Sequence, residues 1–125
     1  MNDERRLLVI DDEADLRDVI QMSLELRQGW TVRTAPSGAA GIALAVLEAP
    51  DAILLDMMMP EMDGPETLRR LRADPATASI PVVFLTAKVQ AGDRAGPPGS
   101  AGLIRKPFDP TALADQVAQL LGWDA

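Results

Sequence analysis

The chain has 125 residues, the length of one ordinary domain, and 47% of them are hydrophobic, enough to fill a core of that size. A net charge of −7 argues against partners such as nucleic acid or an anionic membrane surface. With no cysteine and no histidine, the chain has no disulfide, no thiolate or imidazole metal site, no Ser-His or Cys-His catalytic pair and no phosphohistidine of its own. We expect a single cytoplasmic domain over residues 1–125, without signal peptide, membrane span or output domain.

Apolar runs and turn-forming residues divide the first half of the chain into three strands and two helices. In chain order we expect a strand at 6–10, a helix at 12–27, a strand at 31–35, a helix at 37–49 and a strand at 52–55. Gly29 ends the first helix, and Ser37 is the expected N-cap of the second. The residues expected on the inward faces of these helices are Leu16, Val19, Ile20 and Leu24, and then Ala40, Ala43, Leu44 and Leu47.

The second half continues the alternation. In chain order we expect a helix at 65–73, a strand at 81–85, a helix at 88–95, a strand at 102–105 and a helix at 109–122. Pro65 suits the first turn of its helix, and Asp109-Pro110 is expected to begin the last one. The helix at 88–95 is expected to be short or irregular, because Gly96-Pro97-Pro98-Gly99 follows it and proline costs about 3 kcal/mol inside a helix. The residues expected to be buried on the last helix are Leu113, Val117, Leu120 and Leu121.

Strands that alternate with helices predict an α/β fold with a parallel sheet and right-handed crossovers. Three of the expected strands end abruptly in charge: the first is followed by Asp11 and Asp12, the third by Asp56 and the fifth by Lys106, while Thr86 follows the fourth. If these strands are parallel neighbours, their carboxyl ends meet at one rim, where open α/β sheets bind ligands. The sequence therefore predicts a site at that rim.

The residue types at this rim suggest a divalent cation and a phosphoryl group. Two carboxylates about 4 Å apart repel by roughly 4 kcal/mol at an effective dielectric near 20, so three of them need a cation. Mg²⁺ prefers such hard oxygen ligands, and its affinity should fall if Asp12 or Asp56 is neutralised. The ammonium of Lys106 and the hydroxyl of Thr86 suit phosphoryl oxygens. Asp56 could itself accept a phosphoryl group as an acyl phosphate.

Each of these residues alone has an ordinary interpretation. Acidic residues after the first strand favour a helix start, Asp56 is a common strand-ending residue, and Lys106 before proline suits a solvated surface. The methionines at 57–59 indicate loop packing, since thioethers suit softer metals. The joint pattern, with acid at the ends of the first and third strands, a hydroxyl at the fourth and a lysine at the fifth, favours the site.

These motifs resemble the receiver domain of two-component response regulators over essentially the whole chain. The matching segments are residues 8–13 (LVIDDE), 55–64 (LDMMMPEMDG), 85–88 (LTAK) and 106–108 (KPF). The resemblance implies a flavodoxin-like, doubly wound, five-stranded parallel sheet of order 2-1-3-4-5 with helices on both faces. It also implies that the Lys106–Pro107 bond is often cis, which the tertiary amide before proline permits.

The same resemblance implies roles for the residues at the rim. Asp56 would be the phosphoacceptor, and Thr86 and Lys106 would hold the phosphoryl oxygens. The ligands implied for Mg²⁺ are Asp11 (through water), Asp12, Asp56 and the backbone carbonyl of Met58. Because the side chain of Met58 is apolar and lies two positions after Asp56, we expect slow self-dephosphorylation.

The expected function is that of a stand-alone phosphoacceptor. It would take a phosphoryl group from a partner's phosphohistidine, supplied by a histidine kinase or a histidine phosphotransfer protein, because the chain has no histidine. The resemblance implies that the first helix is a donor-docking face. The signal would pass to an unknown downstream protein by contact or phosphotransfer, and we expect no enzyme activity beyond self-phosphorylation and self-dephosphorylation.

Two departures from the family pattern leave alternatives open. Leu103 stands where family members usually carry an aromatic residue, and the expected helix at 88–95 is interrupted. Both favour a second hypothesis, a degenerate receiver that acts as a phosphorylation-independent interaction module. A third hypothesis is a phosphatase with an aspartyl phosphoenzyme. Such enzymes typically carry Asp-x-Asp after the first strand, whereas this chain has Asp11-Asp12-Glu13.

Overall fold

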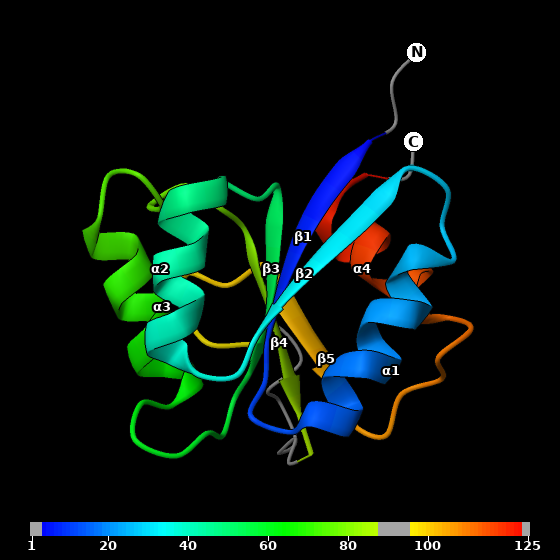
Figure 1. Ribbon diagram of the computed structural model, residues 1–125, viewed down its shortest axis with the longest axis horizontal. Coiled ribbons are helices and arrows are strands. Elements are labelled where there is room, and N and C mark those ends of the chain that lie inside the picture. The colour runs from blue at the N-terminus through cyan, green and yellow to red at the C-terminus, as the bar shows by residue number, and fades with distance from the viewer. Residues whose placement is uncertain (1–3, 88–95, 124–125) are drawn as a thin grey trace.

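The computed structural model describes residues 4–87 and 96–123 (Figure 1). Its elements are β1 (Arg5–Ile10), α1 (Ala14–Glu25), β2 (Trp30–Ala35), α2 (Gly38–Glu48), β3 (Ala52–Asp56), α3 (Gly64–Ala73), β4 (Val82–Thr86), β5 (Gly102–Arg105) and α4 (Leu113–Leu121). All five expected strands are present within a residue or so of their expected bounds. The expected short or irregular helix at 88–95 lies outside the described residues.

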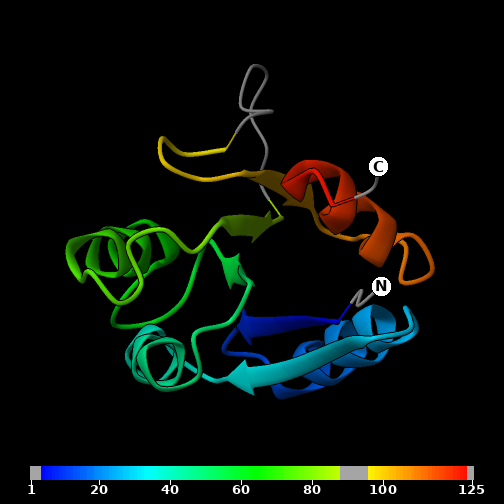
Figure 2. The same cartoon turned by 90° about the horizontal axis from the view of Figure 1, so that it is seen from above.

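The strands form one parallel sheet in the order β2-β1-β3-β4-β5, as expected for the flavodoxin-like fold. Helices α1 and α4 cover one face and α2 and α3 cover the other (Figure 2). A hydrophobic core lies on each face of the sheet, and alternate residues of β1 point into one or the other. Leu7 and Val9 pack with α1 and α4, whereas Leu8 and Ile10 pack with α2 and α3. Every residue of β3 and β4 is buried, which is the pattern of strands covered on both faces.

Helix α2 begins as expected, and its inward face is centred on smaller residues than expected. The hydroxyl of its N-cap, Ser37, accepts a hydrogen bond from the amide of Ala40 at 3.1 Å. The expected inward stripe is only half right: Ala40 and Leu44 are partly buried against the core, whereas Ala43 is exposed and Leu47 is 79% exposed. The buried residues of the helix are Gly38, Gly41 and Ala45. A Cβ on Gly41 would overlap the side chain of Ile10, so the small residues let α2 lie close to the sheet.

Helices α1 and α4 differ from expectation in details. Val19 is 41% exposed, and Ser23 is buried instead, its hydroxyl donating to the Val19 carbonyl at 2.7 Å. Helix α4 begins at Leu113 rather than at residue 109, because the Asp109 carboxylate accepts a hydrogen bond from the Thr111 amide at 2.9 Å and forms a turn there.

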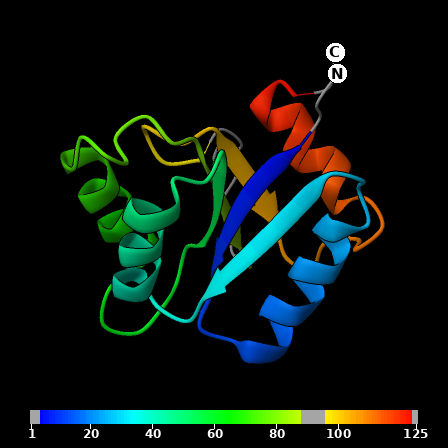
Figure 3. The same cartoon turned by 45° about the horizontal axis from the view of Figure 1, so that its top comes forward.

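Trp123 brings the carboxyl end of the described chain against its amino end. Its indole ring packs edge-on against Trp30, with ring centroids 5.5 Å apart, and the guanidinium of Arg5 lies 4.5 Å from its centroid. The two ends of the described chain therefore lie side by side, at the amino ends of the strands (Figure 3). Among residues 4–87 and 96–123, no helix has the length and apolar composition needed to cross a membrane.

Candidate functional site

Three carboxylates converge at the carboxyl ends of β1 and β3. Asp11 and Asp12 follow β1, Asp56 ends β3, and the two strands pair directly. Asp11 and Asp56 are buried and Asp12 is exposed. One carboxylate oxygen from each of the three lies within 4.8 Å of the other two. The convergence predicted from the charged strand ends is confirmed.

Lys106 directly follows the edge strand β5, and its side chain reaches this cluster across the end of β4. Its amide donates to the Thr86 carbonyl at 2.7 Å, which fixes the backbone just after β5, and the Lys106–Pro107 bond is cis. The ammonium nitrogen then lies 3.3 Å from Asp11 Oδ2 and 3.2 Å from Asp56 Oδ1. Its side chain is only 16% exposed, so the ion pairs lie in a partly desolvated pocket.

Burial and charge shift the pKa values of this pair. Burial raises the pKa of Asp56, and the neighbouring charge of Asp11 raises it further, while Lys106 opposes both without cancelling them. Burial lowers the pKa of Lys106, but the two carboxylates outweigh that effect and the pKa is raised overall. Lys106 therefore stays protonated at neutral pH, and Asp56 is a stronger base than an ordinary aspartate.

The loop after Asp56 is held close to the sheet by glycine. The amide of Gly64 donates to the Met57 carbonyl at 2.9 Å, which places the start of α3 against the end of β3. A Cβ on Gly64 would lie 2.6 Å from the Asp56 carbonyl oxygen and 2.8 Å from the ring of Phe84. The Met58 amide is 3.4 Å from Asp56 Oδ1, and the Met58 side chain is 62% exposed.

Thr86 occupies the rim between the strands that carry Asp56 and Lys106. It is the last residue of β4, it is buried, and its backbone lies one residue beyond the Asp56–Leu85 register pair. The structure thus brings Asp11, Asp12, Asp56, Thr86 and Lys106 to one rim. Their chemical roles stay predictions.

Sequence reasoning missed Arg17, which lies on α1 and contacts the rim. Its guanidinium donates to the backbone carbonyl of Asp11 at 2.8 Å. The only available signal was an arginine one turn into a helix that begins with several acidic residues, and such a pattern suits an ordinary exposed ion pair equally well.

The chemistry of the acidic cluster fits a hard divalent cation. Carboxylate oxygens are the ligands that Mg²⁺ prefers, and the three groups are close enough to share one ion. Both oxygens of Asp11 already accept hydrogen bonds, Oδ1 from the Glu13 amide at 2.9 Å and Oδ2 from Lys106. That leaves Asp12 and Asp56 as the carboxylates best placed for direct ligation.

Comparison with known proteins identifies the family. The response regulator receiver domain profile matches residues 7–118, and the chain belongs to that family. It is 41% identical over 118 residues to the DNA-binding dual master transcriptional regulator RpaA of Synechocystis sp., covering 93% of this chain and 48% of that protein. It is also 41% identical over 118 residues to the response regulator PleD of Caulobacter vibrioides, covering 92% of this chain and 26% of that protein.

Solved structures agree with this assignment. The chemotaxis response regulator CheY4 of Vibrio cholerae superposes with a TM-score of 0.83 at 26% identity, covering 94% of this chain and 98% of that chain. The N-terminal domain of a response regulator receiver protein from Methanoculleus marisnigri gives a TM-score of 0.76 at 38% identity, with 94% and 96% covered. The chain spans half or less of the length of the curated relatives named above.

Proposed function

We propose that Asp56 accepts a phosphoryl group from a phosphohistidine of a partner protein, in a reaction that requires Mg²⁺. The observation that carries the proposal is the Lys106 ammonium shared between Asp11 and Asp56 at a partly desolvated rim, 3.3 and 3.2 Å from their oxygens. A carboxylate oxygen of Asp56 attacks phosphorus and forms the new O–P bond. The N–P bond of the donor breaks, and its electron pair stays with the imidazole nitrogen.

The remaining rim residues are assigned to charge and orientation. Asp12, Asp56 and the Met58 carbonyl would hold the cation directly, and Asp11 would act through water because both of its oxygens are hydrogen-bonded. Mg²⁺, when bound, neutralises the carboxylates and the incoming phosphoryl oxygens. Lys106 turns from the carboxylates to one phosphoryl oxygen, and the Thr86 hydroxyl donates to another.

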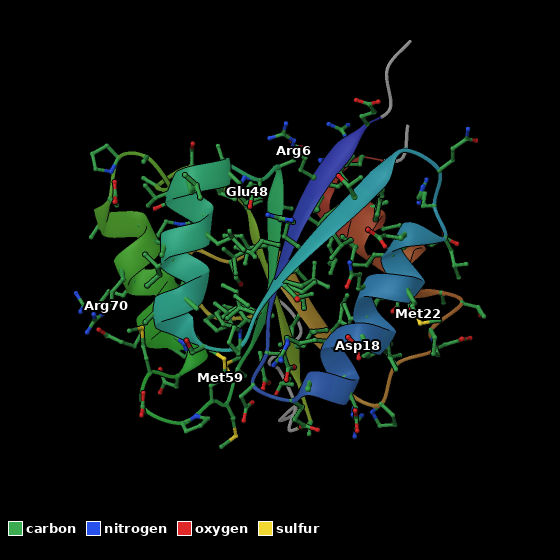
Figure 4. All side chains as sticks on the ribbon, viewed as in Figure 1. Arg6, Asp18, Met22, Glu48, Met59 and Arg70 are labelled. Carbon is green, nitrogen blue, oxygen red and sulfur yellow. The ribbon has the colours of Figure 1, made fainter. Side chains whose placement is uncertain are left out.

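The phosphodonor is proposed to be a histidine kinase or a histidine phosphotransfer protein that docks on α1. Val19, Met22 and Leu26 are 41%, 71% and 74% exposed, and their spacing places them on one side of the helix. Asp18 and Met22 lie on the outward side of α1 (Figure 4). An apolar groove runs from this side to the rim, and its lining includes Leu16, Val19, Lys106, Pro107, Phe108 and Pro110.

We further propose that the chain performs no catalysis beyond its own phosphorylation and dephosphorylation, and that the second step is slow. The Met58 side chain is exposed and apolar, so it offers no hydrogen bond to orient an attacking water. Met58→Asn should speed the decay of phosphorylated protein, measured by intact mass after removal of the donor. An unchanged decay rate would contradict this role for Met58.

Phosphorylation by a small donor tests the main proposal directly. The protein is incubated with acetyl phosphate and Mg²⁺, and intact mass spectrometry measures the gain of one phosphoryl group. The gain should require Mg²⁺, should vanish in Asp56→Asn, and should persist in Asp18→Asn, a matched change on the exposed side of α1. A modified Asp56→Asn protein would refute the site.

A wild type that stays unmodified would favour the second candidate, a phosphorylation-independent interaction module. The observation in favour of that candidate is Leu103, which lies on β5 beside Phe84 and packs, half-buried, against the core on the side of α2 and α3. Amide spectra with and without beryllofluoride would show whether the surface around Leu103 responds to occupation of the rim.

A further inference from the structure

The short loop between β1 and α1 carries two of the three carboxylates. The amide, the carboxylate and the carbonyl of Asp11 are all hydrogen-bonded. Its amide donates to the Ala35 carbonyl at 3.1 Å, which extends the β1–β2 pairing by one residue. Its carboxylate accepts from the Glu13 amide and from Lys106, at 2.9 and 3.3 Å. Its carbonyl oxygen accepts the 2.8 Å hydrogen bond from Arg17.

Asp12 is held in a different way. Its carboxylate is exposed and makes no hydrogen bond or ion pair with any residue of the described ranges, so no side-chain contact aims it at the site. Its direction depends on the backbone, and the peptide plane between Asp11 and Asp12 is rigid. The Asp11 carbonyl oxygen belongs to that plane. The hydrogen bond from Arg17 therefore fixes the plane and, with it, the direction in which the Asp12 side chain leaves the backbone.

We propose that Arg17 is a positioning residue for the metal site, which it serves by orienting Asp12 through the Asp11–Asp12 peptide. This inference rests on the proposed function only in assuming that the rim binds Mg²⁺. Partners that orient metal ligands without touching the metal typically contribute 10–100-fold in affinity. Since Arg17 acts on one of the three carboxylates through a single hydrogen bond, we expect about a 10-fold loss of Mg²⁺ affinity when it is removed.

The direction in which Mg²⁺ affinity changes when Arg17 is removed distinguishes a positioning role from a purely electrostatic effect of its charge. Arg17 brings a positive charge to the loop that carries Asp11 and Asp12, and this charge repels a divalent cation, so through the loss of that repulsion alone its removal would make the site bind the cation more tightly. Positioning predicts weaker binding, because a mobile Asp12 must be ordered when the ion arrives. A loss of Mg²⁺ affinity would therefore indicate positioning, and a gain would indicate that only the charge of Arg17 matters.

The experiment is a Mg²⁺ titration of the whole chain, followed by amide NMR shifts, for the wild type, Arg17→Met and Arg17→Lys. Arg69→Met, on the exposed side of α3, is the matched control for loss of one cation. We expect the dissociation constant to rise about 10-fold in Arg17→Met, less in Arg17→Lys, which keeps a donor and the charge, and hardly at all in Arg69→Met. Unchanged or tighter binding in Arg17→Met would overturn the inference.

Hydrogen exchange in the absence of metal provides a second, independent measurement. Positioning predicts faster exchange at the Asp12 and Glu13 amides in Arg17→Met, with the core strands unchanged. Equal exchange rates would also overturn the inference, and Arg17→Lys supplies the same comparison if Arg17→Met fails to fold. A wild type that binds no Mg²⁺ would refute the proposed metal site itself. If the wild type binds Mg²⁺ and the Arg17 variants bind it with the same affinity, only the role of Arg17 is refuted, and the proposed metal site stands.

Discussion

Lys106→Met removes the ammonium that bridges two buried carboxylates and keeps a side chain of similar length. In the wild type the nitrogen lies 3.3 Å from Asp11 and 3.2 Å from Asp56. Asp11 and Asp56 stay behind in a pocket where water screens them poorly, so their repulsion is no longer opposed. We expect the variant to be less stable than the wild type at neutral pH without Mg²⁺.

The size of the loss follows from the burial of the pair. Removing one partner of a buried ion pair typically costs about 3–5 kcal/mol. Two features reduce that value here: the Lys106 side chain retains 16% exposure, and Asp56, whose pKa is already raised, can relieve the repulsion by taking up a proton. We therefore expect the free energy of unfolding to fall by about 2 kcal/mol.

The pH dependence of this loss has a definite sign. Because burial raises the pKa of Asp56 above its ordinary value of 3.8, ionised Asp56 destabilises the folded protein, and the penalty disappears as the pH falls toward that ordinary value. Removal of Lys106 raises the pKa of Asp56 further. The stability difference between the wild type and Lys106→Met should therefore be largest near neutral pH and should shrink on acidification.

A double-mutant cycle in urea measures the effect, with unfolding followed by circular dichroism. Lys106→Met should cost less in an Asp56→Asn background, because one of the two charges that need the ammonium is already gone, and we expect a coupling energy of about 1 kcal/mol. The slope of the unfolding free energy against urea should stay constant across the set. Strict additivity, or a Lys106→Met variant as stable as the wild type at neutral pH, would refute the electrostatic reasoning.

Three further predictions concern stability. Gly64→Ala places a Cβ 2.6 Å from the Asp56 carbonyl oxygen, so we expect a loss of about 1–3 kcal/mol in urea unfolding; an unchanged midpoint would mean that α3 shifts at no cost. Ser37→Ala should cost about 1 kcal/mol and Ser37→Gly only a few tenths, and equal losses would contradict capping. Hydrogen bonds from Arg69 and Arg70 lower the pKa of Glu66 from 4.5 to about 2. The stabilising contribution of ionised Glu66 is therefore complete above pH 4.5 and is lost as the pH falls toward 2. A titration midpoint of the Glu66 carboxyl near 4.5, measured by NMR, would show that these hydrogen bonds do not persist in solution.

The rim of the sheet could be predicted from the sequence because burial leaves little choice. The apolar runs that became β1 and β3 are covered on both faces, so the charged residues that end them must emerge where the strands end. Asp11 and Asp56 lie there, as predicted. The order of the strands is a different matter, since the hydrophobic pattern alone does not say which strands are neighbours, and it was predicted from the family resemblance.

Three features could not be predicted from the local sequence pattern, because each depends on a contact that the pattern does not reveal: the inward face of α2, the start of α4 and the contact of Arg17. Helix α2 is apolar nearly all round, so periodicity could not tell Leu47, which is exposed, from Gly41, which is buried against Ile10. The start of α4 was misplaced because Asp109 bonds to the backbone of a turn instead of capping the helix. The contact of Arg17 with the Asp11 carbonyl depends on the path of the loop, which residue types do not encode.

The contact of Arg5 with Trp123 has a practical consequence for experiments that attach the protein to something else. The guanidinium lies 4.5 Å from the indole centroid, so both ends of the described chain lie on one side of the molecule. With six residues in β1 at about 3.3 Å each, that side stands roughly 20 Å from the acidic rim. An affinity tag, a fluorophore or a biosensor surface fused at either end would therefore leave the rim facing free solution, open to a large macromolecular donor.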